Sequence, residues 1–222
     1  MSKTKLVVET RLQRLTDVLR HRQPDLRVFM ERVVNYHNVS AILRTSDAVG
    51  VLHVHYFHEG ELPVNEAVSC GAHQWLFLHR EEDVAQGLRR LKAEGYQIVA
   101  TGLFPEAIPF REVDYTRPSV IVVGHELEGI SPEVHKLADY VVKIPMYGMV
   151  QSLNVSVATA VILYEAERQR HAAGYYQTPR LSEEEIESIL GQWAYEDVIR
   201  KKARGRLKGK RPPGHERAPG GL

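Results

Sequence analysis

The chain has 222 residues, of which 43% are hydrophobic, so it can bury one sizeable core and still leave arms or tails. It has no run of about eighteen apolar residues, and residues 1–8 lack the long apolar region of a signal peptide, which argues against a membrane span and predicts a cytoplasmic protein. The net charge is +1, but residues 200–222 hold nine of the 29 Lys and Arg residues and one acid. This segment is predicted to be a basic disordered tail, which either holds a polyanion loosely or is a tolerated terminus.

Helical and strand patterns alternate along the chain. Residues 6–22 repeat apolar side chains about every 3.6 residues and carry arginines on the other faces of the predicted helix. A short apolar segment at 26–30 follows. Five strands are expected after it, at residues 51–57, 75–78, 96–102, 120–124 and 141–144. One expected helix starts at Asn38 or a neighbour and runs to Ala48. The others are 83–94, one that starts at Ser131, one after Gly148 and one from Ser182 towards Ile199.

This alternation predicts an α/β fold with a mostly parallel sheet and helices on both faces. We expect four segments along the chain. They are a basic helical arm at 1–24, the α/β domain at 25–175, a helical extension at 176–199 and the basic tail at 200–222.

Two glycine-containing turns follow predicted strands, at residues 124–129 and 145–154. They should lie at the carboxyl ends of the strands, where α/β sheets usually bind ligands. Neither turn matches a nucleotide-binding fingerprint, so a kinase or an ordinary dinucleotide enzyme is not predicted. A plain tight turn between a strand and a helix is the alternative for each.

Three ordered motifs resemble those of SPOUT-class RNA 2'-O-ribose methyltransferases. They are residues 38–50 (NVSAILRTSDAVG), 124–131 (GHELEGIS) and 144–156 (IPMYGMVQSLNVS). The similarity covers about residues 8–180. Within it, the pieces 22–26, 110–116 and 165–170 resemble the branch that methylates a D-loop guanosine, position 18, of tRNA.

This resemblance implies a specific structure and chemistry. It implies a C-terminal deep trefoil knot that holds S-adenosylmethionine, a homodimer, and methyl transfer to a ribose hydroxyl without a metal. True knots are very rare in proteins, so only the resemblance predicts this one. It also implies that a partner subunit's Arg44 or Asn38 completes the cofactor site.

The resemblance assigns catalytic positions to Arg44, Asn38, Glu126, Ser152 and Asn154. Arg44 would draw the hydroxyl proton with help from the substrate phosphate, although clamping that phosphate is the simpler role for a guanidinium that is always charged. Asn38 would orient Arg44 or cap its helix. Glu126 would accept a hydrogen bond from the ribose or hold its loop. Ser152 and Asn154 lie at a helix start, where capping and support of the arginine are both possible roles.

The motif positions for S-adenosylmethionine are Thr101, Gly124, Ile144, Met149 and Leu153, each with a core or turn role as the alternative. The motif positions for tRNA are Arg11, Arg14, Arg22, Arg168 and Arg170, for which a solvated basic face is the alternative. Thr178 stands where a related protein has a further arginine, so Arg180 or the tail would take over that contact.

No metal site is predicted, because His53, His55 and His58 have no cysteine or acid to complete a ligand set. The single cysteine, Cys70, can form no internal disulfide. Two other functions stay open, methylation of ribosomal RNA and a non-catalytic RNA-binding module of the same fold. The short N-terminal arm favours tRNA over ribosomal RNA.

Overall fold

The structure is a computed structural model that describes the backbone of residues 3–208 and the side-chain burial of residues 9–197. It divides the chain into two units, one of residues 1–17 and 182–222 and the other of residues 18–181. The second unit contains the whole sheet and the predicted ligand-binding turns. The segment boundaries predicted at 24 and 175 stay predictions.

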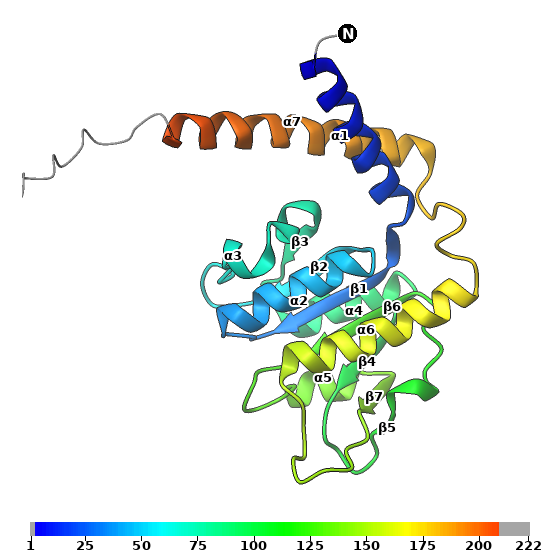
Figure 1. The fold of residues 1–222 in the computed structure, drawn as a ribbon. Helices are drawn as coiled ribbons and strands as arrows, with labels where there is room; N and C mark the ends of the chain where they lie inside the picture. The colour runs from blue at the N-terminus through cyan, green and yellow to red at the C-terminus, as the bar shows by residue number, and fades with distance from the viewer. Residues whose placement is uncertain (1–2, 209–222) are drawn as a thin grey trace, which may run out of the picture. The chain divides into compact units, whose positions relative to one another are not determined.

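A seven-stranded sheet runs through residues 18–181 in the order β3-β2-β1-β6-β4-β7-β5 (Figure 1). All neighbouring strands pair in parallel, which confirms the predicted sheet. The strands are β1 Gln23–Glu31, β2 Val51–Phe57, β3 Phe77–Arg80, β4 Gln97–Thr101, β5 Ile108–Pro109, β6 Ser119–Val123 and β7 Tyr140–Lys143.

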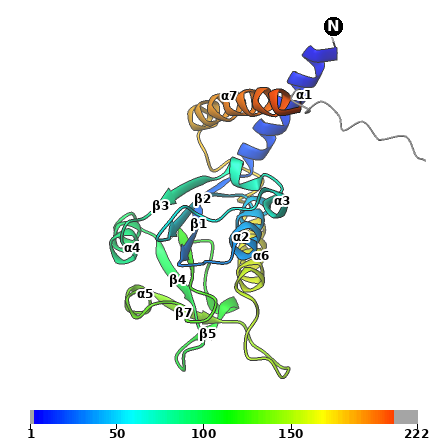
Figure 2. The same cartoon turned by 90° about the vertical axis from the view of Figure 1, so that its left-hand side faces the viewer.

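Helices cover both faces of this sheet, as predicted. Figure 2 shows α2 and α6 on one side and α4 and α5 on the other. These helices are α2 Tyr36–Ala48, α4 Val84–Ala93, α5 Pro132–Leu137 and α6 Val155–Ala172, and short turns α3 Glu66–Ser69, η1 Ala72–Trp75 and η2 Phe110–Glu112 join the elements. Each face buries its own apolar cluster. One surrounds Val28, Ile42 and Ile121, and the other surrounds Phe29, Leu88 and Val122.

Side-chain caps set where the helices begin. The Asp83 carboxylate accepts from the backbone N–H of Gln86 at the start of α4 (2.7 Å), and Ser131 caps α5 ahead of Pro132, as its sequence predicts. In α2 the cap is Asn35, which accepts from the backbone N–H of His37. The helix therefore begins before Asn38, and the capping role considered for Asn38 is wrong.

Strand β7 lies between β4 and β5, so the last strand of the sheet is inserted beside a strand that precedes it in the chain. The segment that joins β4 to β6 passes through β5, on the far side of β7. This order agrees with a chain that threads back through an earlier loop. The knot itself stays a prediction of the family resemblance.

The other unit contains most of α1, Lys3–Arg20, and all of α7, Glu183–Lys208. The predicted capping box opens α7, since Ser182 and Glu185 exchange backbone-to-side-chain hydrogen bonds of 2.8 and 3.2 Å. Helix α7 continues to Lys208, into the first residues of the segment predicted to be a basic tail, and the disorder of that segment stays a prediction. Residues 209–222 of the predicted tail lie outside the described residues.

Candidate active site

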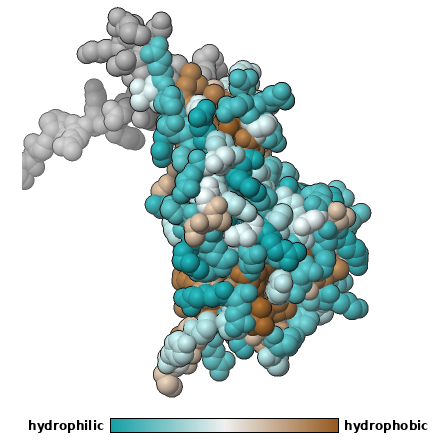
Figure 3. Space-filling model, turned by 90° about the vertical axis from the view of Figure 1, so that its right-hand side faces the viewer, coloured by the Kyte–Doolittle hydropathy of each residue, from teal (hydrophilic) through white to brown (hydrophobic). Residues whose placement is uncertain are grey.

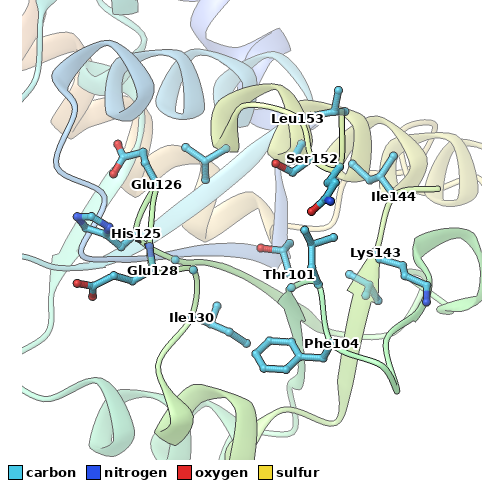
Figure 4. Close-up of a pocket in the computed structure, with 18 of the residues that line it drawn as sticks. Thr101, Phe104, His125, Glu126, Glu128, Ile130, Lys143, Ile144, Ser152 and Leu153 are labelled. Carbon is cyan, nitrogen blue, oxygen red and sulfur yellow. Dashed lines mark hydrogen bonds between the residues drawn. The ribbon is translucent and has the colours of Figure 1, made fainter. Parts of the chain in front are cut away.

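A cavity of about 350 Å³ lies at the carboxyl edge of the sheet (Figure 4). It is formed by the loops that follow β4, β6 and β7 and by the start of α6. Thr101, Gly124, Ile144 and Leu153, four of the five positions predicted to hold the cofactor, line it. Met149, the fifth, is fully exposed and lies outside the lining. In this single chain the predicted contact from Met149 is therefore not formed.

Gly124 is required by a close backbone approach. A Cβ atom built on it would lie 2.2 Å from the carbonyl carbon and oxygen of Gly129, which no side chain tolerates. The loop closes through two backbone hydrogen bonds of 2.9 Å between His125 and Gly129. The glycine at the end of β6 thus allows backbone, instead of a side chain, to form this wall of the cavity.

Three predicted catalytic residues share one hydrogen-bond network beside the cavity. The Asn38 side-chain amide donates to the Glu126 carboxylate (3.0 Å), and the Asn154 amide donates to the Asn38 side-chain oxygen (3.0 Å). These residues come from α2, the loop after β6 and the start of α6. The network therefore ties together the three motifs that the sequence places far apart.

Glu126 also accepts from the backbone N–H groups of Val34 and Asn35, at 3.3 and 3.0 Å. Partial burial alone would raise its pKa, but the hydrogen bonds from Asn38 and from the backbone more than offset this and lower the pKa below its usual value. Glu126 is thus an ionised acceptor that holds its loop against the start of α2. A carboxylate with a lowered pKa is a poor general base near neutral pH.

Asn154 has two roles in this geometry. Its side-chain oxygen accepts from the backbone N–H of Ser156 (2.9 Å) and caps α6, while its amide nitrogen supports Asn38. Capping and active-site support are therefore not alternatives here. Ser152 lines the cavity two residues before this cap, so the capping role considered for Ser152 is wrong.

Arg44 lies apart from this network. It is exposed on α2, and one guanidinium nitrogen is 3.5 Å from the Val68 carbonyl oxygen. It does not line the cavity of its own chain. Arg44 is six positions from Asn38 along the helix, which places the two side chains about 120° apart around the axis. Within one chain Arg44 therefore does not reach the cavity.

The chain matches the family described as the SpoU rRNA Methylase family over residues 25–164, and it matches the C-terminal SpoU rRNA methylase family over residues 168–207. The chain belongs to the SpoU methylase family. The matched residues include the sheet except for the first two residues of β1, the cavity and the Asn38–Glu126–Asn154 network. The resemblance drawn from the three motifs is confirmed.

Individual SpoU proteins are also similar to this chain. The tRNA (guanosine(18)-2'-O)-methyltransferase of Aquifex aeolicus is 56% identical over 201 residues, which are 90% of this chain and 95% of that protein. The crystal structure of the A. aeolicus TrmH/SpoU tRNA modifying enzyme superposes with a TM-score of 0.84 and covers 86% of this chain and 98% of that one. An AdoMet-bound rRNA methyltransferase from Sinorhizobium meliloti superposes with a TM-score of 0.61 at 28% identity and covers 69% and 59% of the two chains.

Two of the five arginines predicted to bind RNA in this SpoU protein are buried. Arg22 is 1% exposed and donates to the carbonyls of Val51 (2.9 Å) and Trp75 (3.0 Å). Arg170 is 0% exposed and donates to the Tyr115 carbonyl (2.8 Å) and the Asp25 carboxylate (2.6 Å). Neither guanidinium can reach a phosphate, so these two predictions are wrong. The sequence shows the charge of an arginine but not the carbonyl groups that surround it.

The other three arginines are exposed, and their RNA contacts stay predictions. Arg168 is 66% exposed at its side chain and is held by the Glu165 carboxylate at 2.7 and 3.0 Å. Arg11 pairs with Asp197 of α7 at 3.3 Å, and Arg14 is exposed on α1. A guanidinium that is paired yet exposed can still exchange its partner for a phosphate oxygen.

Sequence reasoning missed several side chains that line the cavity. These residues are Phe104, His125, Glu128, Ile130 and Lys143. His125 and Glu128 lie inside a motif that was recognised, and Lys143 immediately precedes another. Phe104 lies in the loop after β4, where only the strand end at Thr101 gave a signal.

The described residues contain no group of three or more His, Cys, Asp or Glu side chains that could hold a metal ion. His53 and His55 instead belong to a stack of rings with His79, whose ring centroid lies 4.7 Å from that of His55. Among the described helices, none is long and apolar enough to cross a membrane.

Proposed function

We propose that this protein transfers a methyl group from S-adenosylmethionine to the ribose 2'-OH of guanosine 18 in the D-loop of tRNA. One observation carries the proposal. The cavity and the Asn38–Glu126–Asn154 network lie at the three motifs of this chain that carry the family resemblance, and the chain is 56% identical over 201 residues to an enzyme named tRNA (guanosine(18)-2'-O)-methyltransferase. A tRNA-modifying enzyme of this kind would work in the cytoplasm.

The cavity suits the cofactor in size and in lining. Its volume of about 350 Å³ falls in the range of small-molecule sites. Thr101, Gly124, Ile144 and Leu153 would hold the cofactor largely through backbone groups, since Gly124 allows backbone to form the wall. When bound, S-adenosylmethionine supplies an electrophilic methyl group for an in-line displacement. The protein must then align a ribose hydroxyl with that methyl and remove the hydroxyl proton.

A symmetric dimer would bring Arg44 to this chemistry. Arg44 is exposed and lies outside the cavity of its own chain, so the partner's Arg44 is the residue that would complete each site. Large apolar side chains are exposed around α2 and α6, which is the surface such a dimer would bury. They are Val34, Tyr36, Val157 and Tyr164. Figure 3 shows one molecular face, which is mostly hydrophilic and carries hydrophobic side chains in separate patches.

Arg44 would clamp the phosphate of the target nucleotide and so orient the ribose hydroxyl. Its planar fork of donors fits a phosphate, and its permanent charge makes it an unusual proton acceptor. The network around Asn38 would hold the start of α2 against the cofactor loops. These assignments rest on motif position and on the hydrogen bonds described above.

The test is a methyl-transfer assay with labelled S-adenosylmethionine, followed by digestion and mass spectrometry of the product. Unmodified tRNA should be labelled at guanosine 18, whereas a ribosomal RNA transcript should not. Preferential labelling of the ribosomal RNA would favour the alternative substrate. A protein that binds tRNA and never transfers a methyl group would favour the non-catalytic module and contradict the proposal.

We expect Arg44→Ala to lower kcat by at least ~100-fold, because the hydroxyl loses the group that positions it. Cofactor binding, measured by calorimetry with S-adenosylhomocysteine, should stay close to wild type. Arg89→Ala is the matched control, since Arg89 is an exposed arginine on α4, on the opposite face of the sheet. If both variants retain full activity, Arg44 has no role in transfer.

A further inference from the structure

The loop after β4, residues 102–107, forms one wall of the cavity through Leu103 and Phe104. Figure 4 shows the Phe104 ring directed towards Ile130, another lining residue. The ring also covers Gly102, because a Cβ atom built there would lie 2.5 Å from the ring. The position of Phe104 therefore decides the shape of this side of the cavity.

One side chain outside the cavity contacts this loop at two points. The His135 ring on α5 lies against Phe104, with the two ring centroids 4.3 Å apart and the ring planes tilted by 44°. The Nε2 atom of the same ring is 2.6 Å from the Glu106 carboxylate. His135 thus binds the loop by an aromatic contact on one residue and a polar contact two residues further along.

Helix α5 is a firm base for such a contact. Val134, next to His135, is completely buried in the apolar cluster on this face of the sheet. The end of α5 is also tied to α4, because the Lys92 ammonium donates to the Leu137 carbonyl (2.9 Å). The loop itself is more exposed, with 62% of Leu103 accessible to solvent. Helix α5 therefore restrains the exposed loop at 102–107.

We propose that His135 is a positioning residue for the cofactor site, which holds Phe104 and the loop at 102–107 in the shape that S-adenosylmethionine requires. His135 touches neither the cofactor nor the reacting atoms and acts through Phe104. Preorganising a binding loop raises affinity, because less ordering is left to the binding step. The inference rests on the proposed function, since it names a determinant of affinity for that cofactor.

The test compares His135→Ala, His135→Gln and Glu106→Ala with the full-length protein. We expect His135→Ala to raise the KM for S-adenosylmethionine and the Kd for S-adenosylhomocysteine about tenfold, the scale of a lost charge-assisted hydrogen bond. The kcat at saturating cofactor and the KM for tRNA should stay within about twofold, because the reacting groups keep their contacts. His135→Gln retains an N–H donor for Glu106 and should recover part of the loss.

Lys136→Ala is the matched control, because Lys136 is the exposed neighbour of His135 on the same short helix. It should leave both the KM and the Kd for the cofactor unchanged. Glu106→Ala removes a side chain that is 57% exposed, so it tests the polar contact without threatening the fold. It should weaken cofactor binding less than His135→Ala, since the ring contact with Phe104 remains.

The inference is overturned if His135→Ala and Glu106→Ala bind S-adenosylhomocysteine as tightly as the Lys136→Ala variant does. It is also overturned if His135→Ala lowers only the melting temperature or only kcat. These outcomes differ from a failure of the proposed function. In that case the wild-type protein itself would neither bind the cofactor nor transfer its methyl group.

Discussion

The side of the parallel sheet where the strands begin, its amino edge, and the side where they end, its carboxyl edge, use polar side chains in opposite ways. At the amino edge, Arg22 and Arg170 are sealed inside the protein and their guanidinium groups face backbone carbonyls. At the carboxyl edge, Asn38, Glu126 and Asn154 form a chain of hydrogen bonds beside an open cavity. The first arrangement fastens strands and helices together, and the second positions groups where a substrate can reach them.

Charge alone does not separate these two roles. Asp25 at the amino edge would have a raised pKa from burial, but Arg170 more than offsets this and lowers its pKa. Glu126 at the carboxyl edge also has a lowered pKa, through hydrogen bonds from Asn38 and the backbone that outweigh its burial. Both carboxylates are ionised. Access to the cavity, and not protonation state, therefore distinguishes the structural carboxylate from the one at the candidate site.

Replacing Arg170 with alanine removes the main polar contacts at the amino edge and should give the largest loss of stability. The free energy of unfolding, measured in urea, should fall by about 3 kcal/mol, because the substitution leaves buried polar groups without their main partner. The loss should be at the lower end for a buried pair, since Arg180 still pairs with Asp25 at 2.8 Å.

Arg168→Ala is the control for this prediction. Its side chain is two residues away and exposed, so the loss should stay below about 1 kcal/mol. If Arg168 contacts tRNA, this variant should also weaken tRNA binding and reduce its salt dependence. Equal losses of stability for the two variants would contradict the distinction between the buried and the exposed arginine.

Replacing Asn154 should separate helix capping from active-site support at the carboxyl edge, because its two contacts can be removed separately. Asn154→Asp keeps the oxygen that caps α6 but loses the amide that donates to Asn38, whereas Asn154→Ala loses both. Asn154→Ala should cost about 1 kcal/mol of stability, and Asn154→Asp should cost clearly less. Both variants should transfer methyl groups about tenfold more slowly, in line with a lost hydrogen bond at a site that needs alignment.

Asp83→Ala supplies the comparison, since Asp83 caps α4 and has no place at the cavity. It should lower stability by about 1 kcal/mol and leave the rate of transfer at the wild-type value. An Asn154→Asp variant with wild-type activity would show that Asn154 is a helix cap and no more.

Acid should weaken the protein through a third region, the histidines of β2 and β3. Burial, aided by nearby Arg27, lowers the pKa of His53 from 6.5 to about 3, and burial lowers that of His55 to about 4 despite Glu81. Below pH 6.5 these histidines therefore bind protons in the unfolded chain but not in the folded protein. The free energy of unfolding should fall as the pH drops from 6.5 towards 4.

His53→Gln should reduce this slope. The measurement is a series of urea titrations between pH 7 and pH 4.5 for the wild type and the variant. A wild-type stability that stays level across that range would contradict the lowered pKa values.

Most strands and helix caps were predictable because they depend on local sequence. Residues 51–57 form β2 as expected, and Ser131 and Ser182 start helices where their sequences predict. Prediction from the sequence failed for the arginines, because an arginine can be either exposed to solvent or buried among carbonyl groups. Nothing in the neighbours of Arg22 shows that the carbonyls of Val51 and Trp75 close around it, because these groups meet only after the chain has folded.

The candidate site follows the same division. The three motifs identified the family and the residues of the network, because close packing and placed polar groups restrict which side chains can occupy those positions. Periodicity could not reveal that Asn38, Glu126 and Asn154 share hydrogen bonds, since 88 and 116 positions separate the bonded pairs. The contact between His135 and the loop at 102–107 left no pattern at all.

By itself, the sequence determined the parallel α/β class, the order of most elements and the motifs that place the chain in the SpoU family. These features depend on hydrophobic periodicity, turn residues and capping groups that act within a few positions of one another. Only the tertiary structure decided which arginines are buried, which residue caps α2 and how the cavity wall is held. Those outcomes depend on backbone and side-chain groups from distant segments, whose positions are fixed only when the sheet and its helices pack together.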